Sequence, residues 1–431
     1  MAAAAYPEVR LLSGAPLCLD AWVGDTVGEL RRHVAGLLGC AGRAVRLVQE
    51  GRVLPDERHF GAVSCSQPVI AVRVPEAIAV SGAGDTELRV WDLSSCECAG
   101  TLEAGHSIVR AIFVDFDSGR ALCGGSDGAI KLWDLAAQHC ISSMRGHRGA
   151  VLSITGEASL RQAVSGSFDG AVGVWDVEAC ECLAMLRGHR VPVRTISADF
   201  ARACAVSGAD DGDLRVWQLD HEGSNCRGIL RGHLGPITTF CVADAFDYAA
   251  SGSEDATVRL WYLQEGHLTC KGVLEGHQSG ITALHVNFTA QRGVSASEDR
   301  TLRIWDTGTR SCLATLDGHM GAVTALEVDD ASEDTLLSGS DDGSLHMWNA
   351  SAAEPCHRVL QGDGSAVFGV RADFRTRRAL SWHHSGALRL WDLDAGSCLG
   401  VLEGHTGAVL AVCADLSSLG RAAQRGPMAE G

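Results

Sequence analysis

The sequence predicts an all-β ring of eight four-stranded sheets, preceded by a small α+β domain. Three observations predict this fold class. Eight tryptophans recur at intervals of 42 to 44 residues, and short alternating β-type runs lie between them. Residues 7–74 carry no copy of this repeat and contain a helix signal instead. We therefore expect the small domain over 7–74, the repeat domain over 77–415 and a disordered tail over 416–431.

The third repeat unit shows the pattern in full. It reads "HRGAVLSITGEASLRQAVSGSFDGAVGVWDVEACECLAML" and contains four strand-like runs separated by Gly, Asp, Glu and Ser. A unit of this size cannot bury its own apolar face, so it must stack on its neighbours. Eight units of four strands predict a closed β-propeller with eight blades. A seven-bladed ring with one irregular unit is the alternative.

Two short motifs accompany the repeat. Five units end in Trp-Asp, and Gly-His opens most of them. With these motifs, residues 77 to about 415 resemble the WD-repeat β-propeller family. The resemblance implies a scaffold that binds proteins, in which the turn aspartate, the histidine, a strand hydroxyl and the tryptophan indole of each blade form one hydrogen-bonded staple.

Ser, His and Asp also occur together in catalytic triads, so the spacing of these residues must be weighed. His precedes Asp by 22 residues and Asp precedes Trp by six, and the set recurs in five units, stretched by one residue in the last. A nucleophilic site need occur only once, so repetition favours a structural staple, and no catalytic residue is predicted. The predicted staples are His147, Ser165, Asp169, Trp175; His189, Ser207, Asp211, Trp217; His233, Ser251, Asp255, Trp261; His277, Ser295, Asp299, Trp305; and His319, Ser338, Asp342, Trp348.

The two ends of the repeat region complement each other. The first unit has Ser81, Asp85 and Trp91 but lacks a histidine, and the last Gly-His, at His405, leads into a single strand-like run. We infer that a C-terminal strand at about 408–415 fills the innermost place of the first blade, which would bury the edge strands of an open array.

Two units depart from the motif. The second has Cys123 in place of the hydroxyl, and the eighth has Asp363 for the histidine and Ser385 for the turn aspartate. The eighth also places Trp382, His383 and His384 at its turn. We interpret it as a decayed repeat held by its neighbours. An enzymatic or metal-dependent site there is the alternative, although adjacent histidines on a strand point to opposite faces and cannot easily share one ion. No metal or cofactor is predicted.

The cysteines follow the repeat as well. Of the 17 cysteines, eight occupy one fixed place in the repeat unit, and the sequence has no C-x-x-C pair. We therefore expect reduced thiols at packing positions. These eight are Cys98, Cys140, Cys182, Cys226, Cys270, Cys312, Cys356 and Cys398.

Charge and hydropathy limit the classes of partner. The formal net charge of −17 makes the chain a poor nucleic-acid binder. No apolar run is long enough for a signal peptide or a membrane span. We expect an intracellular protein, cytoplasmic or nuclear, with no membrane or nucleic-acid partner.

The sequence of residues 7–74 predicts a compact domain. A helix is expected over 25–39, with a capping box of Thr26 and Glu29 and an apolar stripe through Val27, Leu30 and Val34. Two strand-like runs precede it within 8–23, and two follow within 44–54 and 68–74. This order is similar to the ubiquitin-like (β-grasp) fold. The resemblance implies a docking patch that could serve ubiquitin-system components, and packing of the same side chains on the propeller is the alternative. The patch residues are Leu12, Val48, Ile70 and Val72.

The family resemblance also implies a binding face on the propeller, made by the turn before each tryptophan strand. Four consecutive turns carry acids in the place before the turn aspartate, and aromatic residues flank them. This arrangement favours a basic or arginine-bearing peptide, while ordinary turn solubility is the alternative. The predicted function is therefore a non-enzymatic scaffold or adaptor. The residues assigned to this face are Phe168, Asp210, Glu254, Glu298, Asp341, Trp382 and His384.

Overall fold

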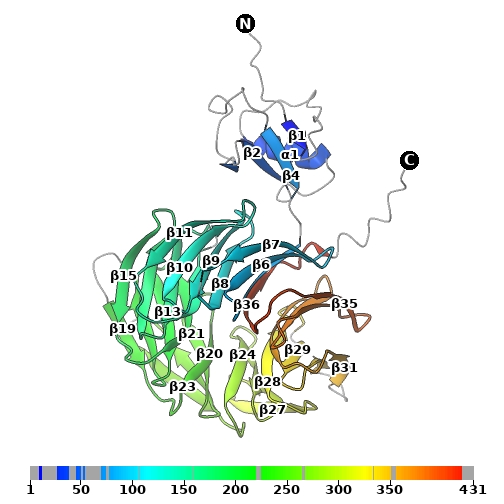
Figure 1. The fold of residues 1–431 in the computed structure, drawn as a ribbon. Coiled ribbons are helices and arrows are strands. Elements are labelled where there is room, and N and C mark those ends of the chain that lie inside the picture. The colour runs from blue at the N-terminus through cyan, green and yellow to red at the C-terminus, as the bar shows by residue number, and fades with distance from the viewer. Residues whose placement is uncertain are drawn as a thin grey trace.

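The computed structural model describes most of the repeat region and five shorter segments before it. The described residues are 77–419, except 106, 158, 220–224, 265–266, 333 and 351–355, together with 9–11, 27–37, 45–49, 52–53 and 69–73. The repeat region forms a ring of sheets, and the earlier segments form a unit of one helix and one sheet (Figure 1).

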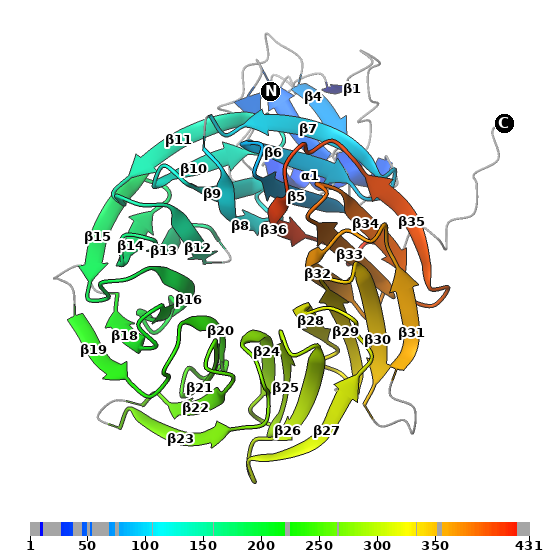
Figure 2. The ribbon, with the colours of Figure 1, turned by 60° about the horizontal axis from the view of Figure 1, so that its bottom comes forward.

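The ring contains eight four-stranded sheets, and within each sheet neighbouring strands in sequence pair with one another. The eight-bladed prediction is confirmed. The first strand of each blade lies nearest the central axis and the fourth lies outermost (Figure 2). Blades one to four comprise β36 (Val409–Ala414), β5 (Ile78–Ala83), β6 (Glu87–Asp92) and β7 (Glu97–Glu103); β8 (Val109–Asp115), β9 (Arg120–Gly125), β10 (Ala129–Asp134) and β11 (His139–Arg145); β12 (Val151–Gly156), β13 (Gln162–Ser167), β14 (Ala171–Asp176) and β15 (Glu181–Arg187); and β16 (Val193–Asp199), β17 (Cys204–Ala209), β18 (Leu214–Gln218) and β19 (Asn225–Leu230).

The other four blades repeat this arrangement. They comprise β20 (Ile237–Val242), β21 (Tyr248–Ser253), β22 (Val258–Tyr262) and β23 (Thr269–Leu274); β24 (Ile281–Asn287), β25 (Arg292–Ser297), β26 (Thr301–Asp306) and β27 (Ser311–Asp317); β28 (Val323–Val328), β29 (Thr335–Ser340), β30 (Ser344–Asn349) and β31 (Cys356–Gln361); and β32 (Val367–Asp373), β33 (Arg378–His383), β34 (Leu388–Asp392) and β35 (Ser397–Leu402).

The hydrophobic core lies between blades. The eight repeat tryptophans are at most 3% exposed. Each contacts a cluster that includes side chains from the preceding blade, as Trp175 does with Leu122 and Leu132. A glycine in the second strand lets the next blade approach closely, and a Cβ at Gly166 would lie 2.7 Å from Val193 Cγ1. The blades therefore depend on their neighbours for stability, as in other repeat architectures.

The ring closes as the two ends of the repeat region predict. Strand β36 pairs antiparallel with β5, and Val412 lies opposite Ser81. Val409 is fully buried in the cluster that joins the first and eighth blades. Leu416 and Leu419 pack against the same cluster, so the propeller continues past the expected boundary at 415 to at least residue 419.

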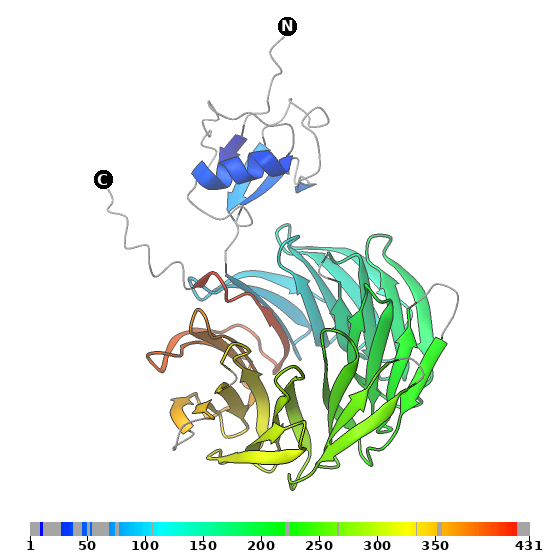
Figure 3. The ribbon, with the colours of Figure 1, turned by 180° about the vertical axis from the view of Figure 1, so that it is seen from behind.

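The earlier segments form a four-stranded sheet with a helix. The strands are β1 (Val9–Leu11), β2 (Val45–Gln49), β3 (Arg52–Val53) and β4 (Val69–Arg73), in the order β1-β4-β2-β3, with β1 parallel to β4. Helix α1 (Val27–Leu37) crosses the sheet (Figure 3). It lies within the predicted range, and the three expected stripe residues are buried. The second strand expected within 8–23 and the patch residue Leu12 lie outside the described residues. None of the helices in the described part of the chain is long and apolar enough to span a bilayer.

The prediction that the periodic cysteines are packing positions is wrong for most of them. Six of the eight are exposed, and Cys182 and Cys356 are partly buried. They lie in the outermost strand, opposite the tryptophan of the third strand, as in the pair Trp91 and Cys98. No further strand of the described residues covers that outer edge, so the thiols face solvent. Cys398, for example, uses its thiol to contact the Gly400 carbonyl at 3.3 Å.

Candidate functional site

Six blades contain the four side chains of the staple, and in five of them hydrogen bonds join all four; in the third blade, His147 Nδ1 has no hydrogen-bond partner. The indole N–H of the tryptophan donates to the serine hydroxyl over 2.7 to 2.8 Å, and the same hydroxyl lies 2.7 to 2.9 Å from histidine Nε2. Histidine Nδ1 approaches the turn aspartate within 3.1 Å in five of them and within 3.4 Å between His147 and Asp169. The strands supply serine and tryptophan, and the connecting loops supply histidine and aspartate.

This geometry serves folding rather than nucleophilic chemistry. Every staple serine is 0% exposed, so no substrate can reach its Oγ. The hydroxyl accepts from the indole and has the imidazole as its second partner, so it is held by two buried groups. A buried donor without a partner costs about 1–3 kcal/mol, so each staple holds a loop, a turn and two strands together.

Burial controls the charge of these groups. It is the largest cause that lowers the pKa of each staple imidazole below 6.5, and the neighbouring aspartate only partly offsets it. Burial raises the pKa of Asp255 and Asp299, but hydrogen bonds outweigh it and lower both to about 2. The bonds to Asp255 come from Thr257, the Leu234 amide and His233. The staples of the fifth and sixth blades therefore pair a neutral imidazole with an ionised carboxylate near pH 7.

The same turns and loops form one face of the ring, because the turn aspartate also binds the loop backbone. The Leu234 amide donates to Asp255 over 2.9 Å, and the Met320 amide donates to Asp342 over 2.8 Å. The loop side chains at this edge point to solvent, with Leu234 94% and Met320 81% exposed, and Phe168 in a turn is 62% exposed. We call this the turn face. It comprises Phe168, Leu234, Glu254, Glu298, Met320, Asp341, Phe368 and His384, all of them exposed.

Comparison with known families supports the resemblance to WD-repeat proteins. The model of the WD domain, G-beta repeat (WD40) matches residues 96–134, 138–176, 180–218, 224–262, 268–306 and 310–349, which together make up more than half of the chain. The chain belongs to the WD40 family. WD40 propellers generally act as non-enzymatic scaffolds and adaptors that bind proteins or peptides.

Similarity to individual proteins is local. The chain is 28% identical over 74 residues to "Cell division control protein 4" of Candida albicans, 33% over 94 to "Ribosome biogenesis protein WDR12 homolog" of Trichoplax adhaerens and 35% over 88 to "Apoptotic protease-activating factor 1" of Danio rerio. These matches span 17%, 20% and 20% of this chain and only 11%, 21% and 7% of those proteins. Among solved structures, the computationally designed Ika8 protein superposes with a TM-score of 0.62 at 29% identity, over 71% of this chain and 90% of that one.

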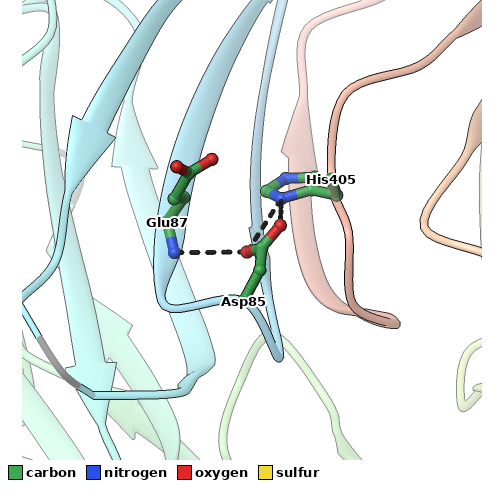
Figure 4. A group of neighbouring side chains, drawn as sticks. All are labelled: Asp85, Glu87 and His405. Carbon is green, nitrogen blue, oxygen red and sulfur yellow. Dashed lines mark hydrogen bonds and ion pairs between the residues drawn. The ribbon is translucent and has the colours of Figure 1, made fainter.

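The staple that closes this WD40 ring joins residues 320 and 324 positions apart. His405 binds Ser81 over 2.7 Å. It also binds Asp85 over 2.8 Å (Figure 4). Glu87 lies near enough for the three groups to be considered as metal ligands, since their donor atoms are within 4.8 Å of one another. However, both imidazole nitrogens are already hydrogen-bonded, and the Glu87 carboxylate binds Arg89 over 2.8 Å. The group is therefore explained by ring closure.

The eighth blade has a substitute staple. His383 occupies the position two residues after Ser381 in the same strand, and its Nε2 lies 2.9 Å from the Ser381 hydroxyl. Trp391 donates to that hydroxyl over 2.9 Å, and His383 Nδ1 binds the Ser365 carbonyl over 3.2 Å. The unit therefore departs from the motif, as its sequence indicates, but keeps a histidine bonded to the strand hydroxyl. Its interpretation as a decayed repeat stays a prediction. Both nitrogens of His383 are engaged, and the side chain is 0% exposed, which disfavours the alternative of a catalytic or metal site.

The second blade keeps only part of the staple in the described residues. The Trp133 indole donates to Cys123 Sγ over 3.2 Å, and burial raises the pKa of Cys123 to about 12. A protonated thiol thus replaces the hydroxyl. The Gly-His histidine of this blade, His106, lies outside the described residues.

Two residues assigned to the binding face from sequence have other roles. Trp382 lies within β33 rather than in the turn, and its ring packs against the cluster between the eighth and first blades. Asp210 forms an ion pair with Arg194, so its charge is neutralised. The aromatic neighbour of His384 is Phe368, with ring centroids 5.3 Å apart. Sequence reasoning missed Phe368, Leu234 and Met320, although an apolar residue directly after Gly-His was a usable signal for the last two.

We expect acid to destabilise the propeller. Because the imidazoles have a lower pKa folded than unfolded, the unfolded chain binds more protons below pH 6.5, so stability is complete above that pH and falls as the pH drops. Because the pKa is lowered in every staple imidazole, their effects on stability add. The free energy of unfolding should therefore fall by about 2 kcal/mol or more between pH 7 and pH 5. Denaturant titrations at pH 7, 6 and 5 measure this loss.

His346 supplies the control for that experiment. Its ring stacks on His319 at 3.8 Å, and burial, followed by the charge of His319, lowers the pKa of His346 to about 4. Five other blades have arginine in this register position, so His346→Arg should fold and lose less stability on acidification. Equal stability at pH 7 and pH 5 in the parent chain would contradict the expectation.

Proposed function

We propose that this WD40 propeller is an adaptor that binds a basic or arginine-bearing peptide of a partner protein on the turn face. The observation that carries the proposal is the exposure of apolar side chains there. Leu234, Met320 and Phe168 are the three most exposed large apolar side chains among the described residues. Large apolar side chains that are exposed together on one face favour a role in binding.

Charge on the turn face supports a cationic ligand. Glu254, Glu298 and Asp341 follow one another on blades five to seven, and none forms an ion pair with a lysine or arginine in the described part of the chain. Burial raises the pKa of Asp341, and the neighbouring charges of Asp342 and Glu298 raise it further. A guanidinium placed among these carboxylates would relieve their mutual repulsion, while the apolar side chains would anchor the flanking residues.

A peptide selection tests this proposal. A displayed library of random twelve-residue peptides, panned against the full chain, should enrich arginine or lysine next to apolar residues. Replacing Glu254, Glu298 and Asp341 together with lysine should weaken the selected peptides at least tenfold, which is about 1.4 kcal/mol. The matched control reverses three exposed acids of the outer strands, Glu97, Glu103 and Asp317, and should bind as the parent does. Enrichment of acidic peptides, or equal loss in the control, would contradict the proposal.

We propose in addition that the N-terminal unit docks to ubiquitin-system components. Two observations support this extension: β1 runs parallel to β4 beneath a single crossing helix, and Val48 lies directly opposite Ile70 in the sheet. A double variant with Val48→Asp and Ile70→Asp should no longer be captured by an immobilised ubiquitin receptor. Its peptide selection should be unchanged. Unchanged capture would remove the ubiquitin extension without affecting the turn face.

A further inference from the structure

A pocket of about 340 Å³ lies between the fifth and sixth blades, and no step of the function proposed above uses it. Its walls include Tyr248, Phe288, Lys271, Gln291, Thr307 and Arg310. Tyr248 begins β21, whereas the turn-face residue Glu254 follows the end of that strand. The pocket therefore opens toward the edge of the blades opposite the turn face.

The aromatic wall of the pocket replaces an ion pair found in the eighth blade. Arg378 lies opposite Asp392 in the eighth blade at 2.9 Å, and the same register holds arginine and aspartate in the second and sixth blades. In the fifth blade this register holds Tyr248 and Tyr262, with ring centroids 5.2 Å apart. Phe288 of the sixth blade stacks on Tyr248 at 6.1 Å and 23°. The three rings form a row across both blades, and Tyr248 remains 38% exposed.

Two cations lie beside this row. The Lys271 ammonium is 4.8 Å from the centroid of the Tyr262 ring. Arg310 donates to the Lys271 carbonyl over 3.3 Å, and both side chains are exposed. Neither forms an ion pair with a carboxylate of the described residues, in a chain with a net charge of −17. The pocket is thus a positive site with an aromatic wall on an acidic protein.

We propose that this pocket binds the phosphorylated tyrosine side chain of a peptide. A tyrosine ring can stack on the exposed face of Tyr248, where aromatic pairs are favourable. A phosphate carries a charge of about −1.5 to −2, which matches the two unpaired cations. Gln291 and Thr307 offer further hydrogen-bond donors. The inference stands apart from the turn face, because it concerns another edge of the ring and a ligand of opposite charge.

The composition of the chain makes the test site-specific. It contains only three tyrosines, Tyr6, Tyr248 and Tyr262, and two lysines, Lys131 and Lys271. The full chain, isotope-labelled at tyrosine rings and with its lysines ¹³C-methylated, is titrated with a capped Gly-phosphotyrosine-Gly peptide. We expect the NMR signals of Tyr248, Tyr262 and Lys271 to shift. Those of Tyr6 and Lys131 should not, since the Lys131 ammonium is bound to the Ala104 carbonyl.

Three further probes separate the sources of binding: the same peptide with unmodified tyrosine, the same peptide with phosphoserine, and inorganic phosphate. Phosphotyrosine should bind at least tenfold more tightly than each of them. Equal binding of phosphate or phosphoserine would overturn the role of the rings, and equal binding of unmodified tyrosine would overturn the role of the cations.

Variants that copy the residues of other blades keep the test independent of folding. Tyr248→Arg with Tyr262→Asp recreates the ion pair of Arg378 and Asp392, so the fold should persist while the aromatic wall is lost. This double variant and Lys271→Met should each weaken phosphotyrosine binding at least tenfold. Arg145→Met, which removes an exposed cation from the outer strand of the second blade, should have no effect. Undiminished binding in the folded double variant would refute the proposal.

Discussion

Deletion of residues 403–431 is expected to leave the propeller unable to fold at 37 °C. The deletion removes β36, so β5 loses its paired strand and the buried side chain of Val409 is lost from the seam. It also removes His405, which leaves the Ser81 and Trp91 pair without its imidazole. Together these losses exceed about 5 kcal/mol, which is comparable with the whole stability of a typical domain, about 5–15 kcal/mol.

Thermal melting and analytical ultracentrifugation measure this effect, and a shorter deletion controls for it. Removing only 420–431 spares β36 and the packed residues Leu416 and Leu419, so the melting temperature should stay within a few degrees of the parent. His405→Ala should fall between the two deletions, because it removes one staple but leaves the strand. A long deletion that melts like the parent would refute closure by β36.

Gly369→Thr is expected to destabilise the eighth blade by about 3 kcal/mol, at the upper end of the range for overpacking. Any Cβ at Gly369 would collide with the ring of Trp382, which lies opposite it in the neighbouring strand. The reverse truncation, Trp382→Gly, should cost about 2–3 kcal/mol, because it empties space beside the cluster at the seam.

The combined variant should recover much of this loss. Threonine facing glycine in this register is the arrangement of Thr195 with Gly208 and of Thr239 with Gly252, so the fourth and fifth blades already contain this pair. We expect it to be more stable than the sum of the single changes by about 2 kcal/mol, a coupling typical of residues in contact. Denaturant unfolding of the four chains measures this coupling. Strict additivity would show that the two residues do not compensate each other.

The regular parts of the fold were predictable because the staple imposes a fixed distance along the chain. The segment from His to Asp must span two strands and the turn between them. The spacing therefore identifies the blades and shows that the first blade lacks its histidine. The same reasoning failed at His383, because its imidazole reaches the Ser381 hydroxyl from two residues further along the same strand and not from the Gly-His position. A sequence motif finds only residues at a fixed spacing, whereas a hydrogen bond can form between residues at any spacing if the fold brings their atoms together.

The candidate binding face was only partly predictable. The exposed turn acids follow from the repeat, but the neutralisation of Asp210 depends on Arg194 of the inner strand, which lies 16 residues earlier. Trp382 was misplaced because β33 ends at His383, so the turn begins two residues later than the sequence interpretation placed it. The aromatic row at Tyr248 joins residues of two blades, and such contacts between units cannot be read from either unit alone.

Closure by the last strand also sets an order of events during synthesis. Ser81 and His405 are separated by 324 positions, so at about 5–20 residues per second the ribosome needs roughly 16 to 65 s to deliver the second after the first. Throughout that time the inner edge of β5 has no paired strand, while the intervening seven blades are synthesised. The blade that is translated first is therefore the one completed last, and a chaperone that shields its edge would act at the N-terminal side of the nascent chain.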